Sequence, residues 1–153
     1  MEQALFFETG GTGGVIGMFK GSKQLMNLRR TNPNAFKKSL SRINWGNYLE
    51  NTLGVKKPTS NVALHAHHIV AKIGNKKAAP FAEKSREILE KHNINPYFDK
   101  DNLVWSPSKN VHGAKQQELI YDTLKKADDS GADESMIRQV LRELGEKAAA
   151  GDL

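Results

Sequence analysis

Residues Leu64-His65-Ala66-His67-His68-Ile69-Val70 place three of the chain's five histidines within four positions of an apolar run. Each imidazole brings two polar nitrogens into its surroundings, so burying three together is costly unless they bind something. In a regular β-strand His65 and His67 point to one face and His68 to the other, so His65 and His67 could hold a metal ion together. If the strand instead ends or twists at the pair, His67 can bind the metal while His68 approaches the same site as a base. Strand geometry leaves both arrangements open.

The flanking sequence predicts that this run is a β-strand followed by an inserted helix and a second strand. Gly74-Asn75 can turn the chain after the first strand, and Ser106-Pro107 ends the second. Hydrophobic periodicity predicts, in chain order, a helix over 34–53, a strand over 62–73, a helix over 78–92, a strand over 103–105, and helices over 111–126 and 134–149. We therefore expect an α+β fold, mostly helical, with a helix between its two short strands.

A later segment adds an asparagine and a histidine to the candidate site. Asn102 precedes the second strand, and His112 lies at the expected start of the next helix. The order His-His, Asn, His meets the needs of a one-metal phosphodiesterase site. One neutral imidazole must activate water, and a metal must neutralise charge on the scissile phosphate and the leaving oxygen. An amide side chain can fix the base or its loop without taking a proton.

Taken together, these motifs resemble the AHH nucleases, a family of the HNH/endonuclease VII superfamily. The resemblance covers roughly residues 62–125 and depends on the following words of sequence: Ala66-His67-His68-Ile69-Val70-Ala71, then Ser85-Arg86-Glu87-Ile88-Leu89-Glu90-Lys91-His92-Asn93-Ile94-Asn95, then Asn102-Leu103-Val104 and Val111-His112-Gly113. The first of these motifs alone is moderately specific for the family. Followed at this spacing by the others, it is a strong signature. The resemblance implies a ββα-metal core with a helix inserted between its two strands.

The resemblance also implies roles for individual residues. His67 would be a metal ligand and His68 the general base. Asn102 would be the positioning asparagine, and His112 a second ligand or a phosphate contact. Such domains commonly form the C-terminal toxin module of bacterial polymorphic toxins. We therefore expect a parent secretion polypeptide N-terminal to this domain, delivery into the cytoplasm of a target bacterium, and a cognate immunity protein, acidic where it meets the basic half of the chain.

One departure from the family pattern concerns the metal. Family members usually have another histidine three to five residues after the position of His112, where this chain has Lys115, Gln116 and Gln117. Gln116 or Asn110 could replace that histidine through an oxygen, or the metal could keep an extra water. Two protein ligands with waters and phosphate oxygens suit Mg²⁺ or Mn²⁺, whereas Zn²⁺ prefers three nitrogen ligands. We therefore expect Mg²⁺ or Mn²⁺, with Zn²⁺ as the alternative.

The charge distribution suits a polyanionic substrate. The chain has 153 residues and a formal net charge of +6. Between residues 20 and 77 there are twelve Lys or Arg residues and a single acid, Glu50, whereas acids gather after residue 128. Contacts with the phosphate backbone of DNA would give affinity without sequence preference. For these contacts we expect the lysines that flank the proposed site, Lys72, Lys76, Lys77, Lys109 and Lys115.

The remaining bulk properties limit the alternatives. Without cysteine, disulfides and thiolate zinc sites are excluded. No run of about 18 apolar residues predicts a membrane span. We interpret residues 1–30 as a glycine-rich lead-in, either a connector from a longer polypeptide or a vector-derived start, and residues 31–153 as one HNH-type domain.

Two other functions fit the same residues. The chain could be an RNase on the same scaffold, or a non-catalytic nucleic-acid-binding module in which the histidines hold a structural metal. The missing histidine after His112 favours the non-catalytic module. His68 argues against it, because a structural site has no need of an imidazole beside the ligand.

Overall fold

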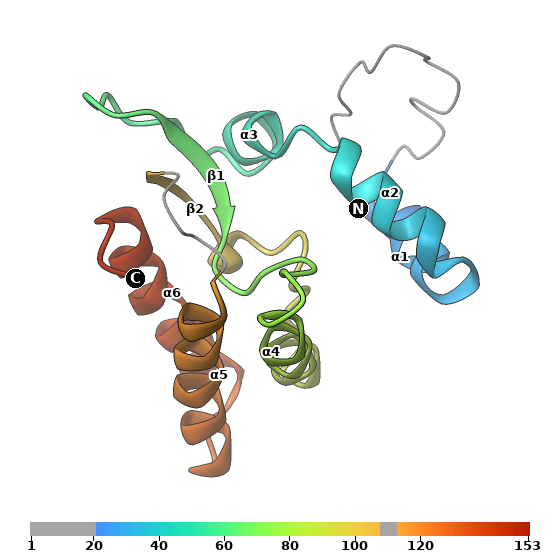
Figure 1. Cartoon of the computed structure of the whole chain (residues 1–153), viewed down its shortest axis with the longest axis vertical. Helices are drawn as coiled ribbons and strands as arrows, with labels where there is room; N and C mark the ends of the chain where they lie inside the picture. The colour runs from blue at the N-terminus through green and yellow to red at the C-terminus, as the bar shows by residue number, and fades with distance from the viewer. Residues whose placement is uncertain (1–20, 108–112) are drawn as a thin grey trace. The chain divides into compact units, whose positions relative to one another are not determined.

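The computed structural model describes residues 21–107 and 113–153, and the chain divides into two units, Met1–Lys57 and Pro58–Leu153. Within the described residues the fold is α+β, with six α-helices and one two-stranded antiparallel sheet (Figure 1). None of the described helices is long and apolar enough to cross a membrane. The elements are α1 (Ser22–Thr31), α2 (Pro33–Arg42), α3 (Trp45–Asn47), the π-helix η1 (Tyr48–Thr52), β1 (Leu64–His68), α4 (Ala79–Lys91), the 3₁₀-helix η2 (Lys100–Asn102), β2 (Leu103–Pro107), α5 (Ala114–Asp129) and α6 (Glu134–Ala149).

The described part of the first unit contains a helical hairpin whose first helix the sequence did not predict. α1 and α2 pack against each other, and α2 buries Phe36 and Leu40. Nine of the ten residues of α1 lie within the residues interpreted as a lead-in, and the helix buries only Leu25. A short connection is possible because Asn32 caps the second helix, accepting the N–H of Ala35 at 3.2 Å.

The helix expected over 34–53 is interrupted. The chain leaves α2 at Ile43, whose backbone is extended, and starts again at Asn44. The side chain of Asn44 accepts the N–H of Asn47 at 3.0 Å and so caps the new turn. Periodicity alone missed this break because the apolar stripe continues across it through Ile43 and Leu49, which are both buried.

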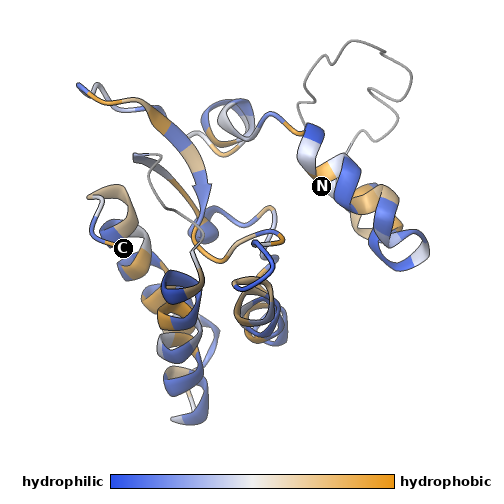
Figure 2. Ribbon diagram, in the orientation of Figure 1, coloured by the Kyte–Doolittle hydropathy of each residue, from blue (hydrophilic) through white to orange (hydrophobic). Residues whose placement is uncertain are grey.

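The second unit is built on the antiparallel pair β1 and β2, with α4 between them in sequence as expected. The register pairs Leu64 with Pro107 and His68 with Leu103. α5 packs against α4 and α6, and α6 packs against β2. Figure 2 shows hydrophobic and hydrophilic residues on different sides of α4, α5 and α6, as expected of helices with one buried face. The buried core comprises Ile69, Val70, Ile88, Leu89, Ile94, Ile120, Leu124, Ala132, Ile137, Leu141 and Leu144.

The first strand is shorter than the expected 62–73, because its partner is short. Pairing stops at His68 opposite Leu103, since η2 immediately precedes β2 and provides no further strand. Ile69, Val70 and Ala71 are nevertheless fully buried. These residues therefore belong to the core without being part of a strand. A short run of apolar residues looks the same in sequence in both cases.

The helices of the second unit lie close to their expected positions. The prediction of 134–149 is confirmed by α6, and α4 is one residue shorter at each end than predicted. α5 extends to Asp129 rather than to residue 126. α6 approaches the sheet closely at Gly145, where a Cβ would lie 3.0 Å from both Ile69 Cδ1 and Val104 Cγ1. A Cβ at this position would require the Ile69 and Val104 side chains, or the helix itself, to shift.

An ion pair joins the C-terminal ends of α4 and α5. His92 Nε2 donates to Asp128 Oδ1 at 2.7 Å, and Lys91 Nζ lies 3.0 Å from Asp128 Oδ2. The His92 imidazole and then the Lys91 ammonium hold the pKa of the Asp128 carboxyl below its ordinary value of 3.8. Because this folded-state pKa is depressed, the ionised carboxylate stabilises the fold above about pH 4, and the effect is lost as pH falls through the folded-state pKa.

We expect Asp128→Asn to lower the melting temperature by a few degrees near neutral pH, and the difference from wild type to shrink as the pH falls below about 4. Thermal unfolding followed by circular dichroism across this range measures it. Asp129→Asn is the control, because Asp129 makes only the exposed pair with Lys125 at 2.7 Å. If the difference in melting temperature between Asp128→Asn and wild type stayed the same at low pH, the ionised Asp128 carboxylate would not be what stabilises the fold.

Candidate functional site

Two of the three clustered histidines are buried at the end of β1. His67 is 4% exposed and His68 is 1% exposed, whereas His65 is exposed. The structure therefore does not bury His65 beside His67, as a site shared by these two residues would require. Within 21–107 and 113–153 no three His, Asp, Glu or Cys side chains are arranged so that they could hold a metal ion. His67 and His68 are both buried and adjacent in sequence, but β1 is paired in register through both, so their side chains leave opposite faces of the strand.

The tautomer of His68 follows from a backbone contact. His68 Nε2 lies 2.8 Å from the carbonyl oxygen of Tyr97. A carbonyl oxygen can only accept, so Nε2 bears the hydrogen and donates it. In the neutral imidazole the lone pair then resides on Nδ1, which is also buried. The contact with Tyr97 thus determines which nitrogen of neutral His68 carries the hydrogen.

Asn102 fixes the backbone that follows the histidine pair. Its Oδ1 accepts the N–H of Val70 at 2.8 Å, and its Nδ2 donates to the carbonyl oxygens of Val70 at 3.1 Å and Pro96 at 2.6 Å. The backbone carbonyl of Asn102 also accepts the N–H of Ile69 at 3.0 Å. The side chain is fully buried, so it binds the segment after β1 and the loop before β2 to each other.

Gln117 and Arg86 complete the hydrogen bonding of residues 69–71, the segment that follows β1. Gln117 Oε1 accepts the N–H of Ala71 at 3.1 Å, and Gln117 Nε2 donates to the carbonyl oxygen of Ile69 at 3.1 Å. Arg86 Nη1 donates to the carbonyl oxygen of Ala71 at 2.7 Å. Of the six backbone N–H and C=O groups of residues 69–71, five are paired with the side chains of Asn102, Gln117 and Arg86, and the N–H of Ile69 with the backbone carbonyl of Asn102. The segment is thereby held in one conformation although it has no strand partner.

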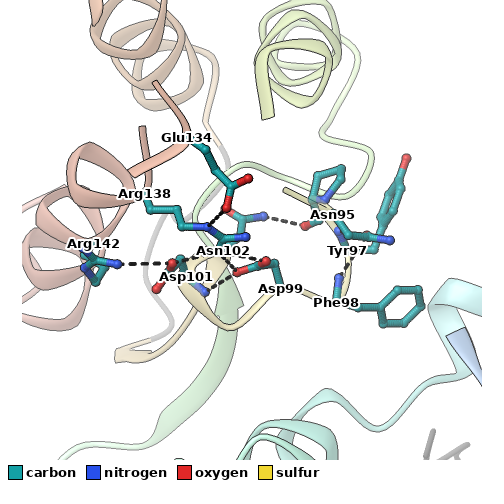
Figure 3. Close-up of polar contacts among 10 residues, drawn as sticks. Asn95, Tyr97, Phe98, Asp99, Asp101, Asn102, Glu134, Arg138 and Arg142 are labelled. Carbon is teal, nitrogen blue, oxygen red and sulfur yellow. Dashed lines mark hydrogen bonds and ion pairs between the residues drawn. The ribbon is translucent and has the colours of Figure 1, made fainter. Parts of the chain in front are cut away.

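A charged network holds the loop that bears Asn102 (Figure 3). Arg138 Nη1 lies 2.9 Å from Asp99 Oδ1 and 3.0 Å from Asp101 Oδ2, and Arg142 Nη1 lies 3.3 Å from Asp101 Oδ2. The Asp99 carboxylate and then the other acids raise the pKa of Arg138. Asp99 Oδ1 also accepts the N–H of Asp101 at 2.9 Å. α6 therefore clamps the turn immediately before Asn102.

A second turn in the same loop holds the His68 acceptor in place. Asn95 Oδ1 accepts the N–H of Tyr97 at 2.9 Å and that of Phe98 at 3.3 Å (Figure 3). Both aromatic side chains are buried. The Tyr97 carbonyl is thus fixed by its own turn and by the burial of its neighbours, which fixes the ring of His68 in turn.

His67 lines a small pocket with polar groups from two other elements. The pocket has a volume of about 150 Å³ and is lined by His67, Ser106, Pro107, Gln116, Ala148, Gly151 and Leu153. Gln116 Oε1 is buried and has no hydrogen-bond partner in the part of the chain that the structure describes. Ser106 Oγ donates to the Ala148 carbonyl at 2.7 Å and so is already engaged. An imidazole nitrogen and an amide oxygen facing one pocket are a donor set that a divalent cation can use.

The structure describes only some of the remaining predicted site residues, and these differ in exposure. His112, Lys109 and Asn110 lie outside the described residues. Lys76, Lys77 and Lys115 are exposed, as expected of residues that bind phosphates. Lys72 is half-buried, and burial lowers the pKa of its ammonium, so it is a weaker candidate.

Sequence reasoning missed three contributors to this arrangement. Gln117 was noted only as a residue that stands where a histidine was expected, and Arg86 only as part of a motif. The Tyr97 carbonyl had no sequence signal at all, because a backbone acceptor has no side-chain identity. Polar residues on the otherwise apolar faces of α4 and α5 were the available clue to Arg86 and Gln117.

Comparison with models of protein families, with curated proteins and with solved structures finds no match to this chain.

We expect Asn102→Leu to destabilise the second unit by at least about 3 kcal/mol, because it leaves the N–H and C=O of Val70 and the carbonyl of Pro96 buried without their partner. Urea unfolding measures the loss. Asn61→Leu is the matched control, because Asn61 is exposed. Equal stability of the two variants would show that the Asn102 bonds do not hold the loop.

Proposed function

We propose that the chain is a divalent-metal-dependent endonuclease with an HNH-type ββα-metal core, acting on DNA with little sequence preference. The observation that supports it best is the bond from His68 Nε2 to the Tyr97 carbonyl, which directs the proton-accepting nitrogen to Nδ1. His68 adjoins His67, and Asn102 fixes the backbone that follows both. The order β1, α4, β2, α5 and the sequence words of the AHH nucleases agree with this assignment.

In this proposal His68 is the general base. Its Nδ1 takes a proton from the attacking water, while Nε2 keeps its hydrogen on Tyr97 O. The imidazolium that forms still donates to the carbonyl, which stabilises it. Asn102 is a positioning residue, since its bonds go to backbone groups rather than toward the reacting atoms. Both histidines are almost fully buried, and His68 is not among the residues that line the His67 pocket, so the proposal requires the chain to move when substrate binds.

The residues that face the His67 pocket fit a hard divalent cation. His67 supplies a nitrogen and Gln116 a buried amide oxygen, and the family resemblance adds His112, four residues before Gln116 in sequence. When bound, the ion neutralises charge on the scissile phosphate and on the departing 3′ oxygen. A mixed nitrogen and oxygen set with water ligands favours Mg²⁺ or Mn²⁺ over Zn²⁺.

The biological role rests on the resemblance alone. We propose that this domain is the effector end of a larger secreted polypeptide, delivered into the cytoplasm of a competing bacterium and neutralised in the producer by an acidic immunity protein. Expression in a bacterial cytoplasm without that partner should then be toxic. His68→Ala should remove the toxicity, and harmless accumulation of the wild-type chain would count against the role.

We expect His68→Ala to abolish plasmid cleavage by the purified protein while metal binding is retained. Cleavage is followed by gel after EDTA treatment and re-addition of Mg²⁺, Mn²⁺ or Zn²⁺. His65→Ala is the matched control, because His65 is exposed on the same strand. Full activity of His68→Ala would refute its role as the base. Cleavage of RNA alone, lost in the same variant, would assign the substrate to RNA.

We expect Gln116→Leu to weaken Mn²⁺ binding by at least about tenfold, measured by calorimetry, because an oxygen ligand is removed. Gln116→His should instead strengthen Zn²⁺ binding relative to Mn²⁺, because it adds a nitrogen ligand. The control is Gln139→Leu, which makes the same change at an exposed position of α6. Unchanged affinities for both ions in both Gln116 variants would exclude Gln116 as a ligand.

A further inference from the structure

The net charge of the chain belongs entirely to its first unit. Met1–Lys57 contains nine Lys and Arg residues and three Glu residues, a net of +6, and Pro58–Leu153 contains fourteen basic and fourteen acidic residues. The unit with the proposed catalytic residues is therefore formally neutral. A nuclease acting on a polyanion gains affinity and association rate from positive charge, and here only the first unit supplies an excess of it.

The excess lies on the surface of the helical hairpin. α1 and α2 lie side by side (Figure 1) and contain no acidic residue. The basic residues that are exposed on the two helices are Lys23, Arg30, Lys37, Lys38 and Arg42. Lys23 and Arg30 are about two turns apart on α1, and Lys38 and Arg42 are about one turn apart on α2. The charges thus form stripes along the helices and not a single cluster.

These five residues have no counter-ion among the described residues, whereas four basic residues of the second unit do. Within the described residues none of the five takes part in an ion pair. In the second unit Lys91, Lys125, Arg138 and Arg142 each pair with an acid. The hairpin charges therefore repel one another, and a bound polyanion would relieve this repulsion.

The rest of the hairpin surface indicates which polyanion fits. Among the described residues the large exposed hydrophobic ones are Val62, Ile73, Leu119 and Met136, none of which lies on α1 or α2, so the hairpin has no apolar face for a membrane. Trp45, beyond α2, donates its Nε1–H to the Leu40 carbonyl at 3.3 Å and packs edge-on against Tyr48 at 5.5 Å. An indole engaged in this way is not presented as a platform for base stacking.

We propose that the α1–α2 hairpin is a second nucleic-acid contact, separate from the proposed catalytic centre, that binds the phosphate backbone of duplex DNA without reading its sequence. The choice of DNA rests on the proposed function, whereas the surface itself is defined by charge. Its binding should be strongly salt-dependent, because each neutralised phosphate releases counter-ions.

The test measures binding of the full chain to a fluorescent duplex of about 20 base pairs, by anisotropy, in EDTA and over about 50–300 mM KCl. For Lys37→Gln/Lys38→Gln we expect a slope of log affinity against log salt that is smaller by about 1.8, and affinity at least about tenfold weaker near 100 mM. The control, Lys126→Gln/Lys147→Gln, removes the same charge from exposed positions of α5 and α6. It should change the slope by less than half as much.

Circular dichroism checks that each variant keeps its helices, and Lys23→Gln/Arg30→Gln on α1 provides a second test should the α2 variant unfold. Equal effects of the hairpin and control variants would overturn the proposal. It would also be overturned if poly-glutamate displaced the duplex as well as unlabelled DNA of the same total charge does, because the surface would then fit an acidic protein. Salt-dependent binding in EDTA by a wild-type chain that cleaves neither DNA nor RNA once Mg²⁺, Mn²⁺ or Zn²⁺ is added would refute the nuclease and leave the hairpin assignment intact.

Discussion

The second unit depends on how the buried segment Ile69–Ala71 satisfies its backbone. Its six N–H and C=O groups lie in the core, where each would cost about 1–3 kcal/mol if left without a partner. A longer strand would solve this through a neighbour, but β2 begins only opposite His68. The polar side chains of Asn102, Gln117 and Arg86 take the place of that neighbour. They come from η2, α5 and α4, so three elements must be in position before the segment is satisfied.

The same constraint determines the geometry of the candidate site. The histidine pair directly precedes the segment, so any error in its backbone is transmitted to His67 and His68. The loop from Asn95 to Asn102 provides both the Tyr97 acceptor for His68 and the amide that holds Val70. Arg138 and Arg142 clamp that loop from α6, and Gly145 on the same helix lets α6 approach the strands. Stability of the core and orientation of the histidines are therefore properties of one hydrogen-bonded assembly.

Local signals explain what could be predicted from the sequence. α6 has an aspartate N-cap, Asp133, and a regular apolar stripe, and its bounds were predicted correctly. The end of β1 was predicted wrongly, because the length of a strand is decided by its partner and not by its own residues. α1 was missed because it buries only one leucine, and the break at Ile43 was missed because the apolar stripe runs through it. Asn102 could be identified from its motif. The role of Gln117 could not, because its hydrogen-bond partners lie 46 and 48 residues away in sequence.

The sequence shows where the charged residues are, and the structure shows which of them the fold uses. The sequence shows a basic first half and an acidic end, which suggests two surfaces of opposite sign. The structure shows that acids near the C-terminal end are largely used within the second unit, where Asp128 pairs with His92 and Lys91 and Glu134 pairs with Arg138. These acids lock helices and loops together and so serve the fold. The hairpin charges have no such structural use, because α1 and α2 are held by buried Leu25, Phe36 and Leu40. Charge that the fold does not require is the part most available for a partner. The exposed lysines of the second unit lie in a unit whose acids balance its charge, whereas α1 and α2 contain no acid, so long-range attraction to a polyanion should originate at the hairpin.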